Sequence, residues 1–221
     1  MTMSIIVGVL GELIRFVEAG GRLPSEPWYQ VVASPGTHAI LAFPGHSVIV
    51  TDLAPEWVAR LLPEEDLSAP LNPPFLRAVE LEKCLRVNNV DIVMLGQRLT
   101  GSPEVVLSVA ARSAPGPKRE DLNHPRVLRA KRYRQEVTVY QAEGGILIIG
   151  RGVGGRWEAA VEVDEQARGK GLGRALALAA RHLIPAERPI WAQIAPGNAS
   201  SVRAFLAAGF VPVGAEALLV P

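Results

Sequence analysis

One stretch of the sequence restricts the fold more than any other, an apolar strand that runs through a glycine-rich turn into a helix. Residues 157–163 place an apolar side chain at every second position, which is the period of a half-buried strand. Beyond the turn, apolar residues recur at helical spacing from Leu172 to Leu183, and Pro185 ends the helix. This order of elements predicts an α/β chain.

The turn itself combines glycines with positively charged residues. Glycines at alternate positions let the backbone approach a ligand closely, because they carry no Cβ atom. The cations around them, together with the N-terminus of the following helix, favour a negative charge. The residues concerned are Arg168, Gly169, Lys170, Gly171, Gly173 and Arg174. We therefore predict an anion site that suits a pyrophosphate; the alternative is a loop whose cations are merely solvated.

Two other phosphate-binding loops do not fit this turn. A dinucleotide fingerprint spaces its glycines as G-x-G-x-x-G, whereas Gly169, Gly171 and Gly173 alternate. A P-loop requires Ser or Thr directly after Gly-Lys, and here Gly171 follows Lys170. The turn belongs to neither class.

The pattern R-x-x-G-x-G at residues 168–173 resembles the acetyl-CoA motif of the GNAT superfamily of N-acetyltransferases. A second segment, residues 198–210, is similar to the family's following motif, in which an Asn opens a helix that closes on Gly-Phe. The resemblance covers residues 119–221. It implies a mixed, mostly antiparallel sheet flanked by helices, splayed between its fourth and fifth strands, with CoA in the splay.

The resemblance also implies a ligand and the residues that bind it. Acetyl-CoA would be the co-substrate, with its thioester carbonyl at the Val163 N–H as oxyanion donor. Asn198 is equally a candidate to cap its own helix. The implied cofactor-binding residues are Val161, Val163, Arg168, Gly169, Lys170, Gly171, Leu172, Gly173, Arg174, Asn198, Ser201 and Phe205.

The general base cannot be read directly from the resemblance. The family often places a Glu or His on the strand before the turn, but the matching positions hold Trp157 and Ala159. Glu158 and Glu162 fall on the opposite face by strict alternation. A β-bulge would turn one of them inward, where burial would raise its pKa toward neutrality. Otherwise both glutamates face solvent or pair with the basic residues 126–134.

The general acid is also uncertain, because Phe205 stands where the family often has a Tyr, and Ser201 is the nearest hydroxyl. The candidate catalytic residues are thus Glu162, Glu158 and Ser201. A missing acid or base costs about 10²–10⁴-fold in rate, less than the roughly 7–11 kcal/mol that positioning supplies. We therefore expect an N-acetyltransferase that acts on a primary amine of a small molecule or protein. A CoA-binding sensor or a structural partner protein is the alternative.

Composition narrows the class of protein further. A formal net charge of +1 over 221 residues gives no reason to expect a nucleic-acid partner. The single cysteine, Cys84, excludes an internal disulfide, fits a reducing cytoplasm, and is predicted to be buried in a helix. The apolar residues 1–9 lack a basic flank and are followed by charged residues, so we expect a cytoplasmic protein without a membrane partner. Abundant Ala, Arg, Gly and Pro are typical of bacterial sequences, and no metal site is predicted.

The polar, proline-containing stretch 113–121 is the clearest break in the chain. It predicts an N-terminal α/β region at 1–118 and a GNAT-like domain at 119–221, which begins with an antiparallel meander of three strands up to residue 163. This second part is short for a complete domain of the family. Either residues 70–118 supply the rest, or the first half is a diverged copy of the fold. The sequence does not identify the acceptor substrate, and a homodimer is one alternative for the oligomeric state.

Overall fold

The computed structural model describes residues 3–64, 66–112 and 124–221. The chain divides into two compact units, of which the first is Met1–Val93 with Pro212–Pro221 and the second is Met94–Val211. The predicted division between residues 118 and 119 lies outside the described residues. The second unit therefore takes in residues before this stretch, and the last ten residues return to the first unit.

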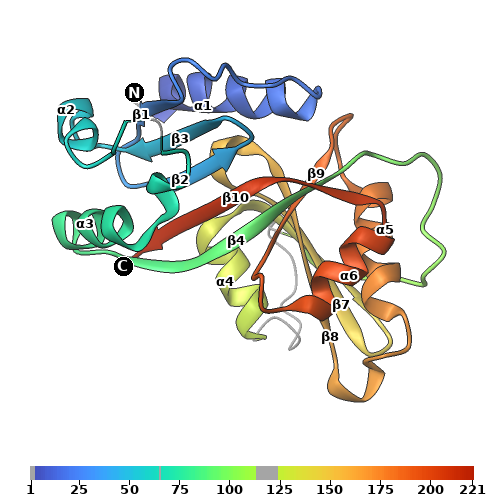
Figure 1. Cartoon of the computed structure of the whole chain (residues 1–221). Helices are drawn as coiled ribbons and strands as arrows, with labels where there is room; N and C mark the ends of the chain where they lie inside the picture. Colours follow the sequence, from blue (N-terminus) through green and yellow to red (C-terminus); the bar gives the residue numbers. More distant parts are fainter. Residues whose placement is uncertain (1–2, 65, 113–123) are drawn as a thin grey trace. The chain divides into compact units, whose positions relative to one another are not determined.

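The first unit packs helices against a mixed sheet (Figure 1). Strand β2 runs antiparallel to both β3 and β10, and β1 runs parallel to β3. Its core includes Ile40, Ile49, Phe75, Val79 and Leu219. Its elements are α1 (Met3–Glu18), β1 (Tyr29–Ala33), β2 (His38–Phe43), β3 (His46–Thr51), α2 (Pro55–Ala59), α3 (Pro73–Lys83), most of β4 (Arg86–Gly96) and most of β10 (Phe210–Val220).

Cys84 corrects one expectation from the sequence, because it is exposed rather than buried. It forms the C-cap of α3 with a left-handed backbone, φ 52°. A residue in this conformation has left the helical path, so the apolar period of the helix no longer directs its side chain to the core.

The second unit contains the predicted meander. Strands β6, β7 and β8 pair antiparallel in sequence order, and β8 then pairs parallel with β9. Together with the first unit, this confirms the predicted α/β class with mostly antiparallel strand pairs. The elements are β5 (Ser108–Arg112), α4 (Pro125–Tyr133), β6 (Gln135–Ala142), β7 (Gly145–Arg151), β8 (Trp157–Val163), α5 (Leu172–Leu183), β9 (Ile190–Ile194) and α6 (Ala199–Ala207).

Helices cover both faces of this meander. On one face, α4 inserts Val127 and Ala130 into a core that contains Ile148 of β7, with Ala160 of β8 packed against it. On the other face lies α5, whose Leu176 would stand 3.2 Å from a Cβ atom built on Gly145. Because side chains alternate along a strand, Glu158 and Glu162 share the α4 face with Ala160, while Val161 and Val163 lie on the α5 face.

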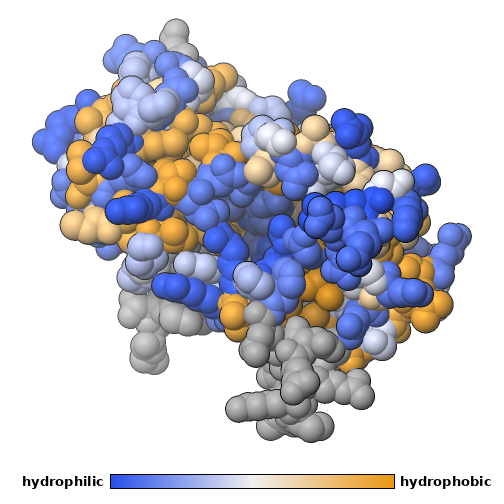
Figure 2. Space-filling model, turned by 90° about the horizontal axis from the view of Figure 1, so that it is seen from below, coloured by the Kyte–Doolittle hydropathy of each residue, from blue (hydrophilic) through white to orange (hydrophobic). Residues whose placement is uncertain are grey.

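The surface is mixed in character. Figure 2 shows hydrophilic residues interspersed with apolar ones over the face that it presents, as is ordinary for folded proteins. Among the described residues, none of the helices has the length and apolar character needed to cross a membrane.

Candidate functional site

A cavity of about 540 Å³ lies where β8 ends and α5 and α6 begin, all within the second unit. It brings together most of the residues that the sequence singled out. Those lining it are Val161, Glu162, Val163, Arg168, Gly169, Gly171, Leu172, Gly173, Arg174, Asn198, Ser201 and Phe205. Lys170 and Glu158 are not part of the lining. Lys170 is exposed and Glu158 is buried elsewhere in the unit.

One edge of β8 is available to a ligand along the cavity. In the described part of the chain, the register of β8 with β9 consists of one pair, Glu158 opposite Trp191, at the start of the strand. The Asp164 N–H donates to the Gly144 carbonyl, 2.9 Å away on the β7 side. Because backbone groups alternate sides along an antiparallel strand, Val161 and Val163 direct their N–H and C=O groups away from β7. Strands β8 and β9 thus diverge beside these valines, which corresponds to the splay that the resemblance implies.

The glycine turn presents backbone rather than side chains to the cavity. Gly169 and Gly171 adopt left-handed conformations, with φ 75° and 85°. A Cβ atom on either would meet nothing within 4 Å, so space lies open above both. Gly171 is the N-cap of α5 and supplies no side-chain hydrogen bond to the N–H groups of the first turn. These N–H groups and the helix dipole are suited to an anion.

The start of α6 forms the opposite wall. The Asn198 side chain accepts a hydrogen bond from the Ser201 N–H at 3.1 Å, which confirms its role as a helix cap. Phe205 is buried and packs edge-on against Phe210, with ring centroids 4.9 Å apart. Phe205 therefore offers the cavity an apolar surface without a hydroxyl group.

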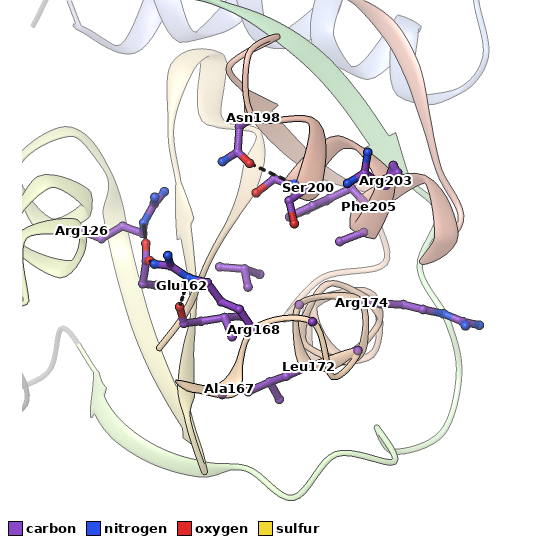
Figure 3. Close-up of a pocket in the computed structure, with 17 residues that line it drawn as sticks. Arg126, Glu162, Ala167, Arg168, Leu172, Arg174, Asn198, Ser200, Arg203 and Phe205 are labelled. Carbon is purple, nitrogen blue, oxygen red and sulfur yellow. Dashed lines mark hydrogen bonds and ion pairs between the residues drawn. The ribbon is translucent and has the colours of Figure 1, made fainter. Parts of the chain in front are cut away.

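Charged side chains meet beside the end of β8 (Figure 3). The Arg126 Nε of α4 lies 2.6 Å from Glu162 Oε2, and Arg168 Nη2 lies 3.8 Å from Glu162 Oε1. Arg168 also donates from its Nε to the Val163 carbonyl at 3.2 Å, so it crosses the open edge of the strand. The Arg174 side chain points away from this group in Figure 3. Glu162 therefore lies near one cation from α4 and one from the turn that follows β8.

Glu158 and Glu162 stay on the α4 face, because β8 has no bulge against β7. Seven successive pairs join the two strands, from Gly145 opposite Val163 to Arg151 opposite Trp157, without a shift of register. Both glutamates therefore pair with basic residues 126–134, as one of the two alternatives from the sequence expects: Glu162 with Arg126 and Glu158 with Arg134.

Glu158 is held between two guanidinium groups. Its carboxylate lies 2.8 Å from Arg156 Nε and 2.8 Å from Arg134 Nε, and its side chain is 5% exposed. Burial by itself raises the pKa of this carboxyl group, but the charges of Arg156 and Arg134 outweigh burial and hold the pKa below that of an ordinary glutamate. The raised pKa that would suit a base is thus not found at Glu158.

We expect Glu158→Gln to lower the free energy of unfolding by about 3–5 kcal/mol at neutral pH, because it leaves buried guanidinium charge uncompensated. In the wild-type protein, the folded-state pKa of the Glu158 carboxyl group is depressed. The stabilisation that this carboxylate provides is therefore present above the unfolded-state pKa of about 4.3, and it is lost as pH falls through the folded-state pKa. Urea unfolding at pH 7 and at decreasing pH measures the free energy of unfolding of both proteins. The difference between the variant and wild type should shrink in acid. Equal stability at pH 7 would contradict a structural role.

Five lining residues are not among the site residues predicted from the sequence: Arg126, Ala167, Ser200, Arg203 and Ala204. Ser200, Arg203 and Ala204 lie within the second recognised segment, residues 198–210, and Ala167 directly precedes the first. Arg126 is 36 positions away from its partner Glu162. The signal that could have found it is the pairing of an acidic strand with a basic helix.

No match is found among curated proteins. A GCN5-related N-acetyltransferase from Kribbella flavida aligns at 17% identity over 66% of this chain and 63% of its own, with a TM-score of 0.41. A second from Sphaerobacter thermophilus aligns at 14% identity over 67% of this chain and 56% of its own, with a TM-score of 0.36. The chain thus covers less than two thirds of either structure.

The family comparison falls on the segment that builds the cavity. The model of the acetyltransferase (GNAT) family matches residues 137–210, which run from β6 to the start of β10. This range contains the open edge of β8, the glycine turn and the start of α6. Within the C-terminal half of the chain, residues 137–210 therefore match the acetyltransferase (GNAT) family.

Proposed function

We propose that this protein is an N-acetyltransferase that transfers the acetyl group of acetyl-CoA to a primary amine of a small molecule or protein. The observation that carries the proposal is one cavity that joins the open edge of β8 to the uncapped N-terminus of α5. A pantetheine arm and a pyrophosphate need these two surfaces side by side. The family match of residues 137–210 supports the same ligand.

The pyrophosphate would bind at the N–H groups that open α5, beside Gly171 and Gly173. The pantetheine arm would then extend along Val161 and Val163 as an additional strand, because their backbone groups face the cavity side. The Val163 N–H would donate to the thioester carbonyl and stabilise the negative charge that develops on its oxygen during attack. Asn198, Ser201 and Phe205 would enclose the arm from α6.

The reaction requires a neutral amine, since a protonated nitrogen has no free electron pair. Glu162 lines the cavity one residue before Val163, so we propose it as the group that accepts the amine proton. The nitrogen then forms a bond to the carbonyl carbon and the carbon–sulfur bond breaks. The leaving thiolate takes a proton from water, directly or by way of the Ser201 hydroxyl, which regains its proton from water. Glu158 lies outside the cavity and is proposed to anchor α4 on β8.

Arg168 is 63% exposed, so its attraction for phosphates should depend on salt. We expect Arg168→Ala to weaken acetyl-CoA binding more at low than at high ionic strength, because the Debye length falls from about 30 Å at 0.01 M to about 3 Å at 1 M. Lys170→Ala is the matched control, since Lys170 is a neighbouring cation outside the cavity lining. Calorimetric titrations at two salt concentrations measure both. Equal losses in the two variants would show that only the charge of the loop matters.

Two measurements test the proposed function and separate it from a CoA-binding sensor or structural partner. Calorimetry reports whether acetyl-CoA binds, and a thiol reagent reports CoA release in the presence of a panel of amines. We expect binding together with amine-dependent release. Binding without release for any amine would favour the sensor, for which the lack of a hydroxyl at Phe205 is the supporting observation. No binding would contradict both functions.

A further inference from the structure

The cavity reaches both faces of β8, and the two faces present different charges. The α5 face carries the glycine turn and the helix N-terminus. The α4 face carries the pair Arg126 and Glu162, whose side chains are 45% and 25% exposed and line the cavity. Their charged atoms lie 2.6 Å apart. A positive and a negative group thus stand side by side, both accessible, on the face that the phosphate site does not use.

We infer that the acceptor is a small amine that carries a carboxylate or similar anionic group within a few atoms of its nitrogen, as an amino acid does. This inference rests on the proposed function and names the substrate class of the same site. With the cofactor on the α5 face, the amine must approach the thioester at Val163 from the α4 face. The ammonium group then meets Glu162 and the carboxylate meets Arg126, so one ion pair is replaced by two.

The charge balance of the lining argues against a polycationic acceptor. Four arginines and one glutamate of the described residues line the cavity, namely Arg126, Arg168, Arg174, Arg203 and Glu162. Cofactor phosphates on the α5 face would pair with Arg168 but leave Arg126 on the other face. A polyamine or a lysine-rich peptide adds positive charge there, whereas an amino acid supplies the carboxylate that a planar guanidinium group binds with two hydrogen bonds.

The same exchange explains how Glu162 becomes a base. In the structure Glu162 Oε2 is engaged by Arg126 Nε at 2.6 Å. A substrate carboxylate that takes over Arg126 releases Glu162 for the proton of the amine. The acceptor's anionic group therefore serves both recognition and activation.

The test compares amines that differ only in the anionic group. The full-length protein is given acetyl-CoA with each of several amino acids, the matching amino-acid amides, and spermidine, and thiol release is followed. We expect kcat/KM for at least one amino acid to exceed that of its amide by about tenfold or more, corresponding to about 1.4 kcal/mol. Without recognition the amide should react faster, because its less basic nitrogen is more often neutral at pH 7.

Three variants locate the effect. Arg126→Ala should reduce the ratio of kcat/KM between acid and amide to one or below, and Arg126→Lys should restore part of it. Arg129→Ala removes the same charge from the same helix outside the cavity and should leave the ratio unchanged. The affinity for acetyl-CoA, measured by calorimetry, should be unchanged in all three.

Other results would overturn the inference. These are a preference for amides or for spermidine, an equal fall for acids and amides in Arg126→Ala, or the same change of ratio in Arg129→Ala. The proposed function and the substrate class are contradicted by different results. Acetyl-CoA binding with turnover of neutral or polycationic amines contradicts the substrate class alone, whereas absence of acetyl-CoA binding contradicts the proposed function and the substrate class together.

Discussion

Gly173→Val is expected to abolish acetyl-CoA binding in a protein that remains folded. A Cβ atom at position 173 would touch Ala204 and Val163 at 3.7 Å, an ordinary contact distance. The backbone needs no glycine there, since Gly173 has no positive φ, and Val is a better helix former than Gly. The two added methyl groups would occupy cavity space beside the helix N-terminus. We expect a loss of at least about 100-fold in affinity, or about 2.8 kcal/mol.

Gly197→Val is the matched control for this variant. Gly197 precedes the cap of α6, lies outside the cavity lining, and a Cβ atom there would meet nothing within 4 Å. Calorimetry should find wild-type affinity for acetyl-CoA in Gly197→Val and no measurable heat in Gly173→Val, with similar melting temperatures for both. Wild-type affinity in Gly173→Val would contradict the placement of the pyrophosphate at α5 and remove the main support for the proposed function.

The parts of the site that follow one another in sequence could be predicted. The period of residues 157–163, the glycines at alternate positions and the stop at Pro185 each act locally, so strand, turn and helix appear where expected. The cap at Asn198 is local as well. Most of the cavity lining follows, because the two recognised segments carry it.

Features that depend on distant parts of the chain could not be predicted. Arg126 enters the cavity only because α4 packs its apolar stripe on the same face of β8 that carries Glu162. The burial of Glu158 depends on Arg134 and Arg156 closing over it from two elements. The division into units also depends on the last ten residues, which pair with β2 rather than with their neighbours in sequence. Pairing of the glutamates with residues 126–134 is one alternative from the sequence, but the sequence does not say which arginine each one takes or which glutamate stays exposed.

Glu162 and Glu158 illustrate how the same residue type in one strand takes on two roles. Both face α4, and each pairs with an arginine at one end of that helix. Glu158 is covered by Arg156 as well, so it has no route to a ligand. Glu162 retains a quarter of its side-chain surface and lines the cavity. We therefore propose Glu162 as the proton acceptor because its side chain is exposed to the cavity, whereas that of Glu158 is not.

Glu162→Gln is expected to lower kcat by about 10²-fold or more with little change in the affinity for acetyl-CoA, because it removes a proton acceptor but no phosphate contact. Glu165→Gln is the matched control, an exposed glutamate three positions further on that does not line the cavity. Steady-state kinetics with a reactive amine measure both variants. If Glu162→Gln turns over like wild type, the proton must leave through water or the substrate itself, and the ion pair with Arg126 would be left with a role in binding alone.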